Sequence, residues 1–150
     1  MKQLRIINKK ATFDYTISDR FEVGISLLGC EVKSIRTGHA KLEGSFVRIV
    51  DSELVLVNAE IFPYAFASAI GYDPKRTRRL LAHKREILGI QNKMQAGRLT
   101  LIPLSLYTKG PHIKLEVGIA SGKKEYEKRE KIKKKTEERE LERAWRGKIK

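Results

Sequence analysis

Residues 99–107, LTLIPLSLY, and residues 112–120, HIKLEVGIA, carry the clearest structural pattern of the chain. In the second segment every other residue is apolar, at Ile113, Leu115, Val117 and Ile119, which is the period of a strand with one buried face. Residues 109–111, KGP, separate the segments and suit a turn. We therefore expect an antiparallel hairpin, in which Pro103 needs an edge or a bulge because proline donates no ladder hydrogen bond.

Two earlier parts of the chain repeat the strand pattern. Residues 12–17 and 21–27 alternate apolar with polar side chains, and Ser18, Asp19 and Arg20 could form the turn of a hairpin. Residues 46–50 and 53–61 are rich in β-branched and apolar residues around a two-residue turn, so they predict another hairpin.

Helical spacing is expected mainly between the second and third hairpins. Residues 78–95, RRLLAHKREILGIQNKMQ, place apolar side chains near a 3.6-residue period, and Gly97 would end that helix. Residues 31–36, EVKSIR, fit either a strand or a short helix. Six strands in hairpins with one inserted helix predict an all-β-dominated fold, a small closed antiparallel barrel of oligonucleotide-binding (OB) type.

The chain is strongly basic. Its 32 Lys and Arg against 18 Asp and Glu give a formal charge of +14 over 150 residues, and nucleic acid is the usual partner of such a protein. We expect no membrane partner because no apolar run approaches the roughly 18 residues of a membrane span. Residues 1–10 lack a signal-peptide pattern, which predicts a cytoplasmic location. Cys30 is the single cysteine and is expected to pack rather than react.

Residues 122–150, GKKEYEKREKIKKKTEERELERAWRGKIK, form a separate basic segment. Thirteen Lys and Arg against seven Glu leave a net charge of +6 there and +8 on residues 1–121. Glu precedes a cation by four residues at four places, a spacing that supports a helix. The segment has no continuous apolar stripe to hold a helix on its own domain. We predict an RNA-binding domain at 1–121 and a tail at 122–150 that orders on a partner, although a solvated tail fits the composition too.

The densest functional signal of the domain is residues 72–86, YDPKRTRRLLAHKRE. Six of these fifteen residues are cationic and are predicted to contact phosphates: Lys75, Arg76, Arg78, Arg79, Lys84 and Arg85. Tyr72 offers a face on which an unstacked base could lie. It could equally cap the barrel.

Catalytic signatures are scarce. The chain has no glycine-rich phosphate loop, HExxH or GxSxG motif, and its three histidines stand far apart. We therefore predict no enzyme activity, metal, cofactor or small-molecule substrate. An RNA-modifying or RNA-cleaving enzyme stays open as an alternative, with Glu22, Glu31 or His83 as acid or base.

Several stretches together resemble the SsrA-binding protein (small protein B) family. They are NKKATFDYTI (8–17), FEVGISLLGCEVKSIRTG (21–38), YDPKRTRRLL (72–81), LTLIPLSLY (99–107) and GKKEYEKR (122–129). The family is the bacterial partner of transfer-messenger RNA in trans-translation. The resemblance implies an OB-type barrel with flanking helices and a tail that is disordered when free and helical in the ribosomal mRNA path.

The resemblance also implies site residues. Glu22 and the neighbourhood of Leu81 and His83 would grip the D-loop region of the tRNA-like part of transfer-messenger RNA. The tail would enter the decoding centre with Gly122, Lys123, Lys124, Tyr126, Lys128 and Arg129. The sequence departs from common family residues at Glu127 and His83, which makes the contacts that the resemblance implies at those two positions less specific.

These observations lead to one main functional prediction. The chain is expected to be an adaptor that binds transfer-messenger RNA and delivers it to stalled ribosomes, where the tail meets ribosomal RNA at the decoding centre and in the mRNA channel. A structural ribosomal protein or a general RNA-binding protein is the principal alternative.

Overall fold

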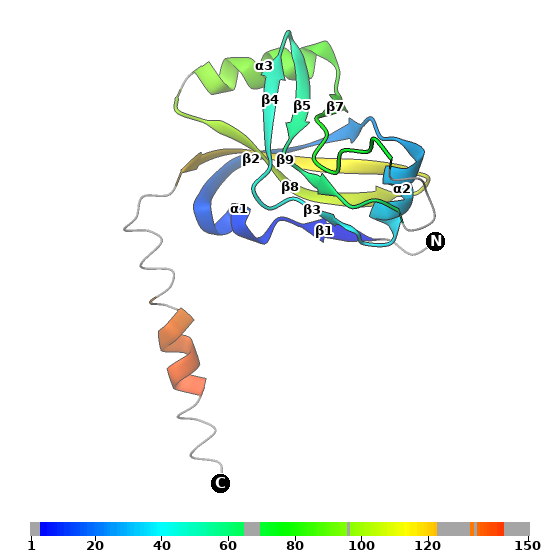
Figure 1. Ribbon diagram of the computed structural model, residues 1–150. Helices are drawn as coiled ribbons and strands as arrows, with labels where there is room; N and C mark the ends of the chain where they lie inside the picture. Colours follow the sequence, from blue (N-terminus) through cyan, green and yellow to red (C-terminus); the bar gives the residue numbers. More distant parts are fainter. Residues whose placement is uncertain (1–3, 65–69, 96, 123–132, 134, 143–150) are drawn as a thin grey trace.

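The computed structural model describes residues 4–64, 70–95, 97–122, 133 and 135–142. These residues are mostly sheet with helices (Figure 1). In chain order the strands are β1 (Arg5–Ile7), β2 (Tyr15–Ile25), β3 (Ala40–Lys41), β4 (Phe46–Val50), β5 (Glu53–Val57), β6 (Glu60–Ile61), β7 (Arg78–Leu81), β8 (Thr100–Lys109) and β9 (His112–Gly122). The labelled helices are α1 (Lys9–Asp14), α2 (Gly29–Arg36) and α3 (Lys84–Gln95), and residues 135–142 are helical as well.

The larger sheet closes on itself. Its strands follow the order β8, β4, β5, β7, β2, β9, and β9 pairs again with β8, while β1 adds to β8. All of these pairings are antiparallel. Strands β3 and β6 form a small ladder of their own. Closure leaves the ring strands few free edges and encloses one core.

The hairpin predicted at 99–120 is confirmed as β8 and β9, which pair from Thr100↔Ala120 to Lys109↔His112. Gly110 adopts a φ of 61° in the turn, which glycine tolerates without a Cβ clash. The register shifts between Pro103 and Ser105. The proline therefore lies at a bulge, as its missing N–H donor requires.

The second hairpin is confirmed as β4 and β5, and its turn is tight. Val50 pairs with Glu53, and both intervening residues have positive φ, 50° at Asp51 and 63° at Ser52. That geometry matches the right-handed twist of the flanking strands. Strand β5 ends at Val57, before the predicted boundary at 61.

The hairpin predicted over residues 12–27 is wrong. Residues 9–14 form α1, and β2 runs without a turn from Tyr15 to Ile25. Strand β2 pairs with β9 from Tyr15 to Gly24, and the extra residue at Ser18 is absorbed as a bulge between Ile17 and Asp19. The Ser18 hydroxyl donates to the carbonyl of Ile119 at 3.0 Å. Continuous pairing with a long neighbour strand thus overrides the local turn preference.

The helix predicted to begin at residue 78 begins at Lys84 instead. Residues 78–81 form β7, where buried Arg78 and Leu80 alternate with exposed Arg79 and Leu81. This alternation of buried and exposed side chains is the period of a strand. It is not visible in the letters RRLL, where two cations are followed by two leucines. Pairing with both β2 and β5 fixes these residues as a strand.

Helices α1, α2 and α3 cover the closed sheet at three places (Figure 1). Helix α3 buries Ile87 and Ile90 in the main core, and α2 buries Ile35 there. Residues 31–36, which fit either a strand or a short helix by sequence, are therefore helical. Helix α1 buries Ala11 in a smaller apolar cluster. The described part of the chain holds no helix long and apolar enough to span a membrane.

Candidate nucleic-acid interface

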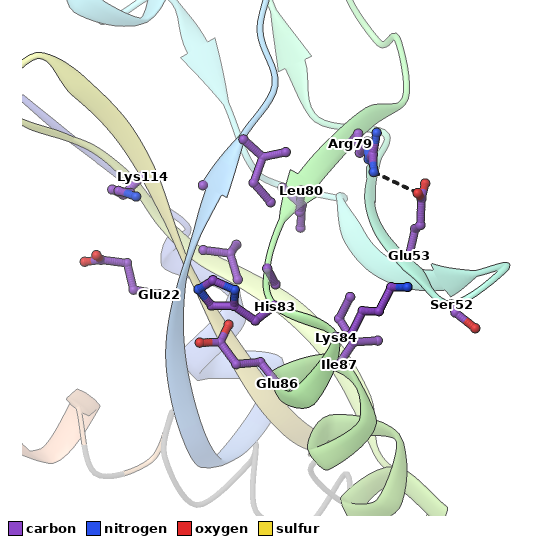
Figure 2. Close-up of a pocket in the computed structure, with 14 residues that line it drawn as sticks. Glu22, Ser52, Glu53, Arg79, Leu80, His83, Lys84, Glu86, Ile87 and Lys114 are labelled. Atoms are coloured by element: carbon purple, nitrogen blue, oxygen red, sulfur yellow. Dashed lines mark ion pairs between the residues drawn. The ribbon is translucent and has the colours of Figure 1, made fainter.

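A groove of about 550 Å³ lies where β2, β7 and the start of α3 meet the β4–β5 turn (Figure 2). Five residues predicted to contact RNA line it together: Glu22, Arg79, Leu81, His83 and Lys84. Glu22 lies about sixty positions before the other four in the sequence. The pairing of β2 with β7 brings the two segments side by side.

The alternation of buried and exposed side chains along β7 places an apolar side chain at the groove. Leu80 enters the core and Leu81 points outward, 53% exposed. Leu81 pairs with Gly24, where an added Cβ would lie 3.1 Å from the Leu81 Cβ. Glycine therefore allows β2 and β7 to approach closely, and the exposed leucine offers a flat contact for a base or ribose.

The beginning of α3 adds positive charge to one side of the groove. Lys84 and Arg85 are exposed in the first helical turn, where cations are normally unfavourable because the helix dipole is positive there. Such a placement favours an anionic partner. Arg79 is exposed nearby and pairs with Glu53 at 2.8 Å, an exposed ion pair that a phosphate could displace at little cost.

Glu22 lines the groove from β2, and two side chains hold its carboxylate. The Tyr107 hydroxyl donates to Oε2, and Lys109 Nζ lies 3.2 Å from Oε1. The hydrogen bond from Tyr107 is the main cause that lowers the pKa of Glu22 below its ordinary value, and Lys109 adds to it. Glu22 is therefore an ionised acceptor at neutral pH.

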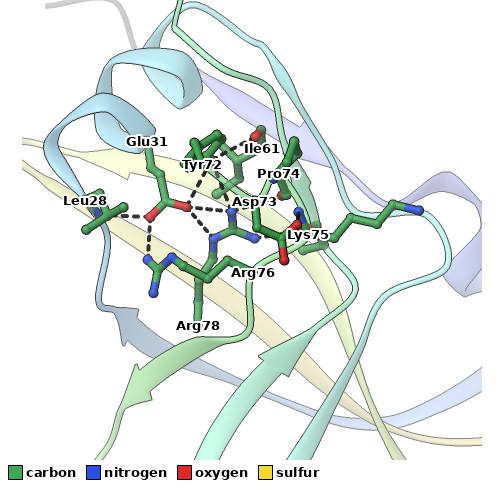
Figure 3. Close-up of polar contacts among 10 residues, drawn as sticks. Leu28, Glu31, Ile61, Tyr72, Asp73, Pro74, Lys75, Arg76 and Arg78 are labelled. Atoms are coloured by element: carbon green, nitrogen blue, oxygen red, sulfur yellow. Dashed lines mark hydrogen bonds and ion pairs between the residues drawn. The ribbon is translucent and has the colours of Figure 1, made fainter. Parts of the chain in front are cut away.

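Glu31 is the centre of a buried polar network on α2 (Figure 3). Its Oε2 accepts hydrogen bonds from Arg78 Nε at 2.8 Å and Nη2 at 2.5 Å, and from the Tyr72 hydroxyl at 3.1 Å. Its Oε1 accepts from Arg76 Nη2 at 2.5 Å and from the Leu28 N–H at 2.9 Å. The network ties the segment around residues 72–78 to α2.

The prediction that Arg78 contacts a phosphate is wrong for this structure. Its side chain is 0% exposed, and its remaining donors reach the carbonyls of Ala59 at 2.7 Å and Pro74 at 3.0 Å. A fully buried guanidinium with these partners has no surface to offer RNA. The sequence could not show this because the partner Glu31 lies 47 positions away.

Tyr72 and Arg76 are also drawn into the network. The single hydrogen of the Tyr72 hydroxyl has two acceptors within reach, the Ile61 carbonyl at 2.9 Å and Glu31 Oε2 at 3.1 Å, which favours the capping interpretation over base stacking. Arg76 keeps 36% of its side chain exposed while it pairs with Glu31. Of the predicted cluster, Lys75 is exposed on this segment and does not line the groove.

The network also bears on the enzyme alternative. Burial works to raise the pKa of Glu31, but the hydrogen bonds from Arg76, the Leu28 N–H and Arg78 outweigh it, so that pKa lies below its ordinary value. Burial and the Glu31 charge raise the pKa of Tyr72. A carboxylate held this way is a poor proton acceptor. Among the described residues no group of three or more His, Cys, Asp or Glu is placed to hold a metal ion.

Lys114 of β9 is a groove residue that sequence reasoning missed. The sequence does contain a signal for an outward-facing side chain there, because Lys114 is one of the polar residues that alternate with apolar ones over residues 112–120. Only the pairing Gly24↔Lys114 places it beside β2.

The predicted tail contacts lie mostly outside the described residues. Lys123, Lys124, Tyr126, Lys128 and Arg129 fall there, whereas Gly122 is the last residue of β9. Farther on, Lys133 and residues 135–142 are helical and exposed.

Comparison with known proteins extends over almost the whole chain. Residues 5–147 match the family described as SmpB protein. The chain is 48% identical to the SsrA-binding protein of Sulfurihydrogenibium sp. over 143 residues, covering 95% of this chain and 94% of that one. It is 47% identical to the SsrA-binding protein of Carboxydothermus hydrogenoformans over 147 residues, covering 98% and 99%.

A solved structure agrees with these relatives. A chain from the structure described as "tmRNA-SmpB: a journey to the center of the bacterial ribosome" has a TM-score of 0.68 and 42% identity, and the match covers 81% of this chain and 85% of that chain. Sequence and fold thus point to the same group of proteins. The chain belongs to the SmpB protein family.

Proposed function

We propose that this chain is a non-enzymatic adaptor that binds transfer-messenger RNA and delivers it to stalled ribosomes for trans-translation. Relatives that match nearly the full chain are named SsrA-binding proteins. The solved neighbour belongs to a structure that names tmRNA, SmpB and the bacterial ribosome. A ribosomal partner in bacteria supports a cytoplasmic location.

The observation that carries the proposal is the groove shared by β2, β7 and α3. It combines an exposed apolar contact at Leu81, cations at Arg79 and Lys84, the imidazole of His83 and an acceptor at Glu22. Cations bind phosphates, and the apolar and acceptor groups suit splayed nucleotides of a structured RNA loop. The groove is the proposed grip on the tRNA-like part, with Lys75 and Arg76 outside it.

We infer further that the closed ring is a barrel of OB type. Six antiparallel strands closed through β8 and β9 support this assignment. Barrels of that type bind nucleic acid on one strand face and adjoining loops, which matches a groove beside β2 and β7.

The tail is proposed to act apart from the domain. Residues 1–121 would bind RNA, and residues 122–150 would order in the mRNA channel and the decoding centre. Lys123, Lys124, Lys128 and Arg129 would contact phosphates and Tyr126 would stack on a base. The helical, exposed residues 135–142 support a tail that can adopt helix without packing on the domain core. A disordered segment loses entropy on binding, so it would lock only in a vacant channel that fits it.

RNA copurification tests the function. The full chain carrying an affinity tag is expressed in its own bacterium, and the associated RNA is sequenced. Transfer-messenger RNA should dominate, and the protein should be substoichiometric on ribosomes and enriched on stalled ones. Equal amounts on every ribosome would instead identify a structural ribosomal protein, and a broad RNA population would identify a general RNA-binding protein.

Two leucine variants sharpen this test. Leu81→Glu places a negative charge in the groove and should lose the dominant RNA. Leu88→Glu is the matched control because Leu88 on α3 has a similar exposure, 58% against 53%, and does not line the groove. Loss of the RNA in both variants would contradict the assignment of the groove.

A further inference from the structure

Glu22 is an acidic side chain in a groove proposed to bind a polyanion. The Tyr107 hydroxyl and Lys109 each occupy one of its oxygens. A carboxylate has about four lone-pair sites, so two acceptor positions stay open. Glu22 repels phosphate, so an RNA group that gains from contact with it must be a hydrogen-bond donor on a base or ribose.

Tyr107 is well placed to fix the carboxylate. It lies on β8 and is 9% exposed, and the Arg5 guanidinium lies 4.5 Å from its ring centroid. Strand β9 separates β8 from β2, and Tyr107 pairs there with Lys114 while Glu22 pairs with Glu116. The hydroxyl therefore reaches Glu22 diagonally across the outer face of β9, from a ring that packing holds in place.

The protonation states suit this contact. Burial and the hydrogen bond to Glu22 raise the pKa of Tyr107 to about 12, so the phenol remains a donor at neutral pH. The same bond lowers the pKa of Glu22, which keeps the carboxylate an acceptor. Glu116 is occupied separately, since Arg20 Nη1 lies 3.4 Å from its Oε1.

The bases differ in how well they match two open acceptor positions. The Watson–Crick edge of guanine presents two adjacent donors, N1–H and the N2 amino group. Adenine and cytosine place an acceptor beside their amino donor, and uracil flanks its N3–H with two carbonyls, so each sets an acceptor against a carboxylate oxygen. A carboxylate held in one orientation therefore favours guanine.

We propose that Glu22 binds the Watson–Crick edge of an unpaired guanine and that Tyr107 is the positioning residue that orients the carboxylate for it. The inference rests on the proposed function and deepens it by naming the base that this part of the groove selects. Direct readout is possible only where the base is splayed from its helix, as in an RNA loop.

Nucleotide-analogue interference tests the base contact. The probe is a transcript of the tRNA-like part of transfer-messenger RNA in which inosine phosphorothioate replaces guanosine at random. Inosine lacks only the N2 amino group, so one position should weaken binding of the full chain by about tenfold or more, the effect of one hydrogen bond to a charged group. A 7-deazaguanosine transcript is the control, because its Watson–Crick edge is intact, and it should bind normally at that position.

Protein variants test whether Glu22 and Tyr107 are responsible for the interference by inosine. Glu22→Gln has one acceptor oxygen in place of two, so it should bind guanosine and inosine equally at that position. Tyr107→Phe removes only the hydroxyl and should shrink the preference severalfold while the salt dependence of binding stays unchanged. Tyr15→Phe, on the same strand as Glu22 and outside the groove, should keep the full preference. Thermal unfolding of each variant checks that the domain is folded.

Three results would overturn the inference. Interference absent from the unaltered protein, or retained in Glu22→Gln, would exclude a guanine edge at this carboxylate. Full preference in Tyr107→Phe would show that Tyr107 does not position Glu22. If the unaltered protein failed to bind even the transcript without inosine, the proposed function itself would fall, which is a distinct outcome from binding without interference.

Discussion

Arg78 of β7 and Glu31 of α2 form an ion pair with Nη2 and Oε2 2.5 Å apart, and both side chains are 0% exposed. A buried charge needs a partner because its desolvation in the protein interior costs several kcal/mol. This pair and its neighbours hold the segment leading into β7 against α2, so the strand that carries the groove residues Arg79 and Leu81 is anchored from behind.

Removal of Arg78 should destabilise the domain strongly. Arg78→Met keeps much of the side-chain volume but leaves Glu31 short of its principal partner, so the free energy of unfolding should fall by about 3–5 kcal/mol. Urea denaturation measures it. Arg79→Met is the control on the same strand, because Arg79 forms an exposed ion pair and should change stability by less than about 1 kcal/mol. Similar losses in both variants would show that Arg78 is not the anchor.

Acid should weaken the same network. The pKa of Glu31 in the folded protein lies below its ordinary value of 4.5, so the unfolded chain binds its proton more tightly. Its contribution is therefore present above that value and is lost as pH falls through the lowered pKa of the folded state.

Urea denaturation of the unaltered protein and Glu31→Gln between about pH 6 and about pH 3 measures this loss. The difference in unfolding free energy between the two proteins should narrow as the pH falls. A constant difference would mean that Glu31 does not contribute to the acid sensitivity.

The salt dependence of RNA binding should depend on the cations at the start of α3 and not on Arg78. Replacing Lys84 and Arg85 by Gln should reduce the slope of log affinity against log salt by about 0.7–0.9 for each phosphate that the protein then leaves unneutralised. Filter binding at several salt concentrations gives the slope. Lys41→Gln removes an exposed cation of β3 that does not line the groove and should leave it unaltered. An unchanged slope in the double variant would place these cations away from the RNA.

Truncation after Ser121 should separate RNA binding from ribosome rescue. All residues that line the groove lie within 1–121, so affinity for transfer-messenger RNA should remain close to that of the full chain. Peptide tagging on stalled ribosomes should be lost together with the tail. A truncated protein with most of its RNA affinity gone would contradict the division of roles.

A proline substitution tests whether the tail works as a helix. Lys133 is helical and exposed, and proline in a helix interior costs about 3 kcal/mol. Lys133→Pro should reduce peptide tagging far more than Lys133→Gln, which removes the same charge and keeps good helix propensity. Both should bind RNA equally. Equal tagging by the two variants would indicate that the tail acts as an extended polycation.

Local patterns in the sequence are sufficient for the elements whose partners are close neighbours in the chain. The alternation at 112–120 and the two-residue turn at 51–52 predict β8–β9 and β4–β5 correctly. The bulge at Pro103 follows from its missing donor. The motifs at 8–17, 21–38 and 72–81 likewise identify the family from the sequence alone, because they occur along the chain in the family's order.

Tertiary pairing decides what local patterns cannot. Residues 12–25 form the end of α1 and one continuous strand because β9 pairs with β2 from Tyr15 to Gly24. Residues 78–81 form a strand because β2 and β5 lie on either side of them. The cationic cluster at 75–85 likewise divides, with Arg78 buried against Glu31 and Lys84 exposed at the groove. Charge and composition depend on sequence alone, but whether a cation meets solvent or a buried carboxylate depends on partners about 45 positions away, which only the packing of α2 beside β7 brings into contact.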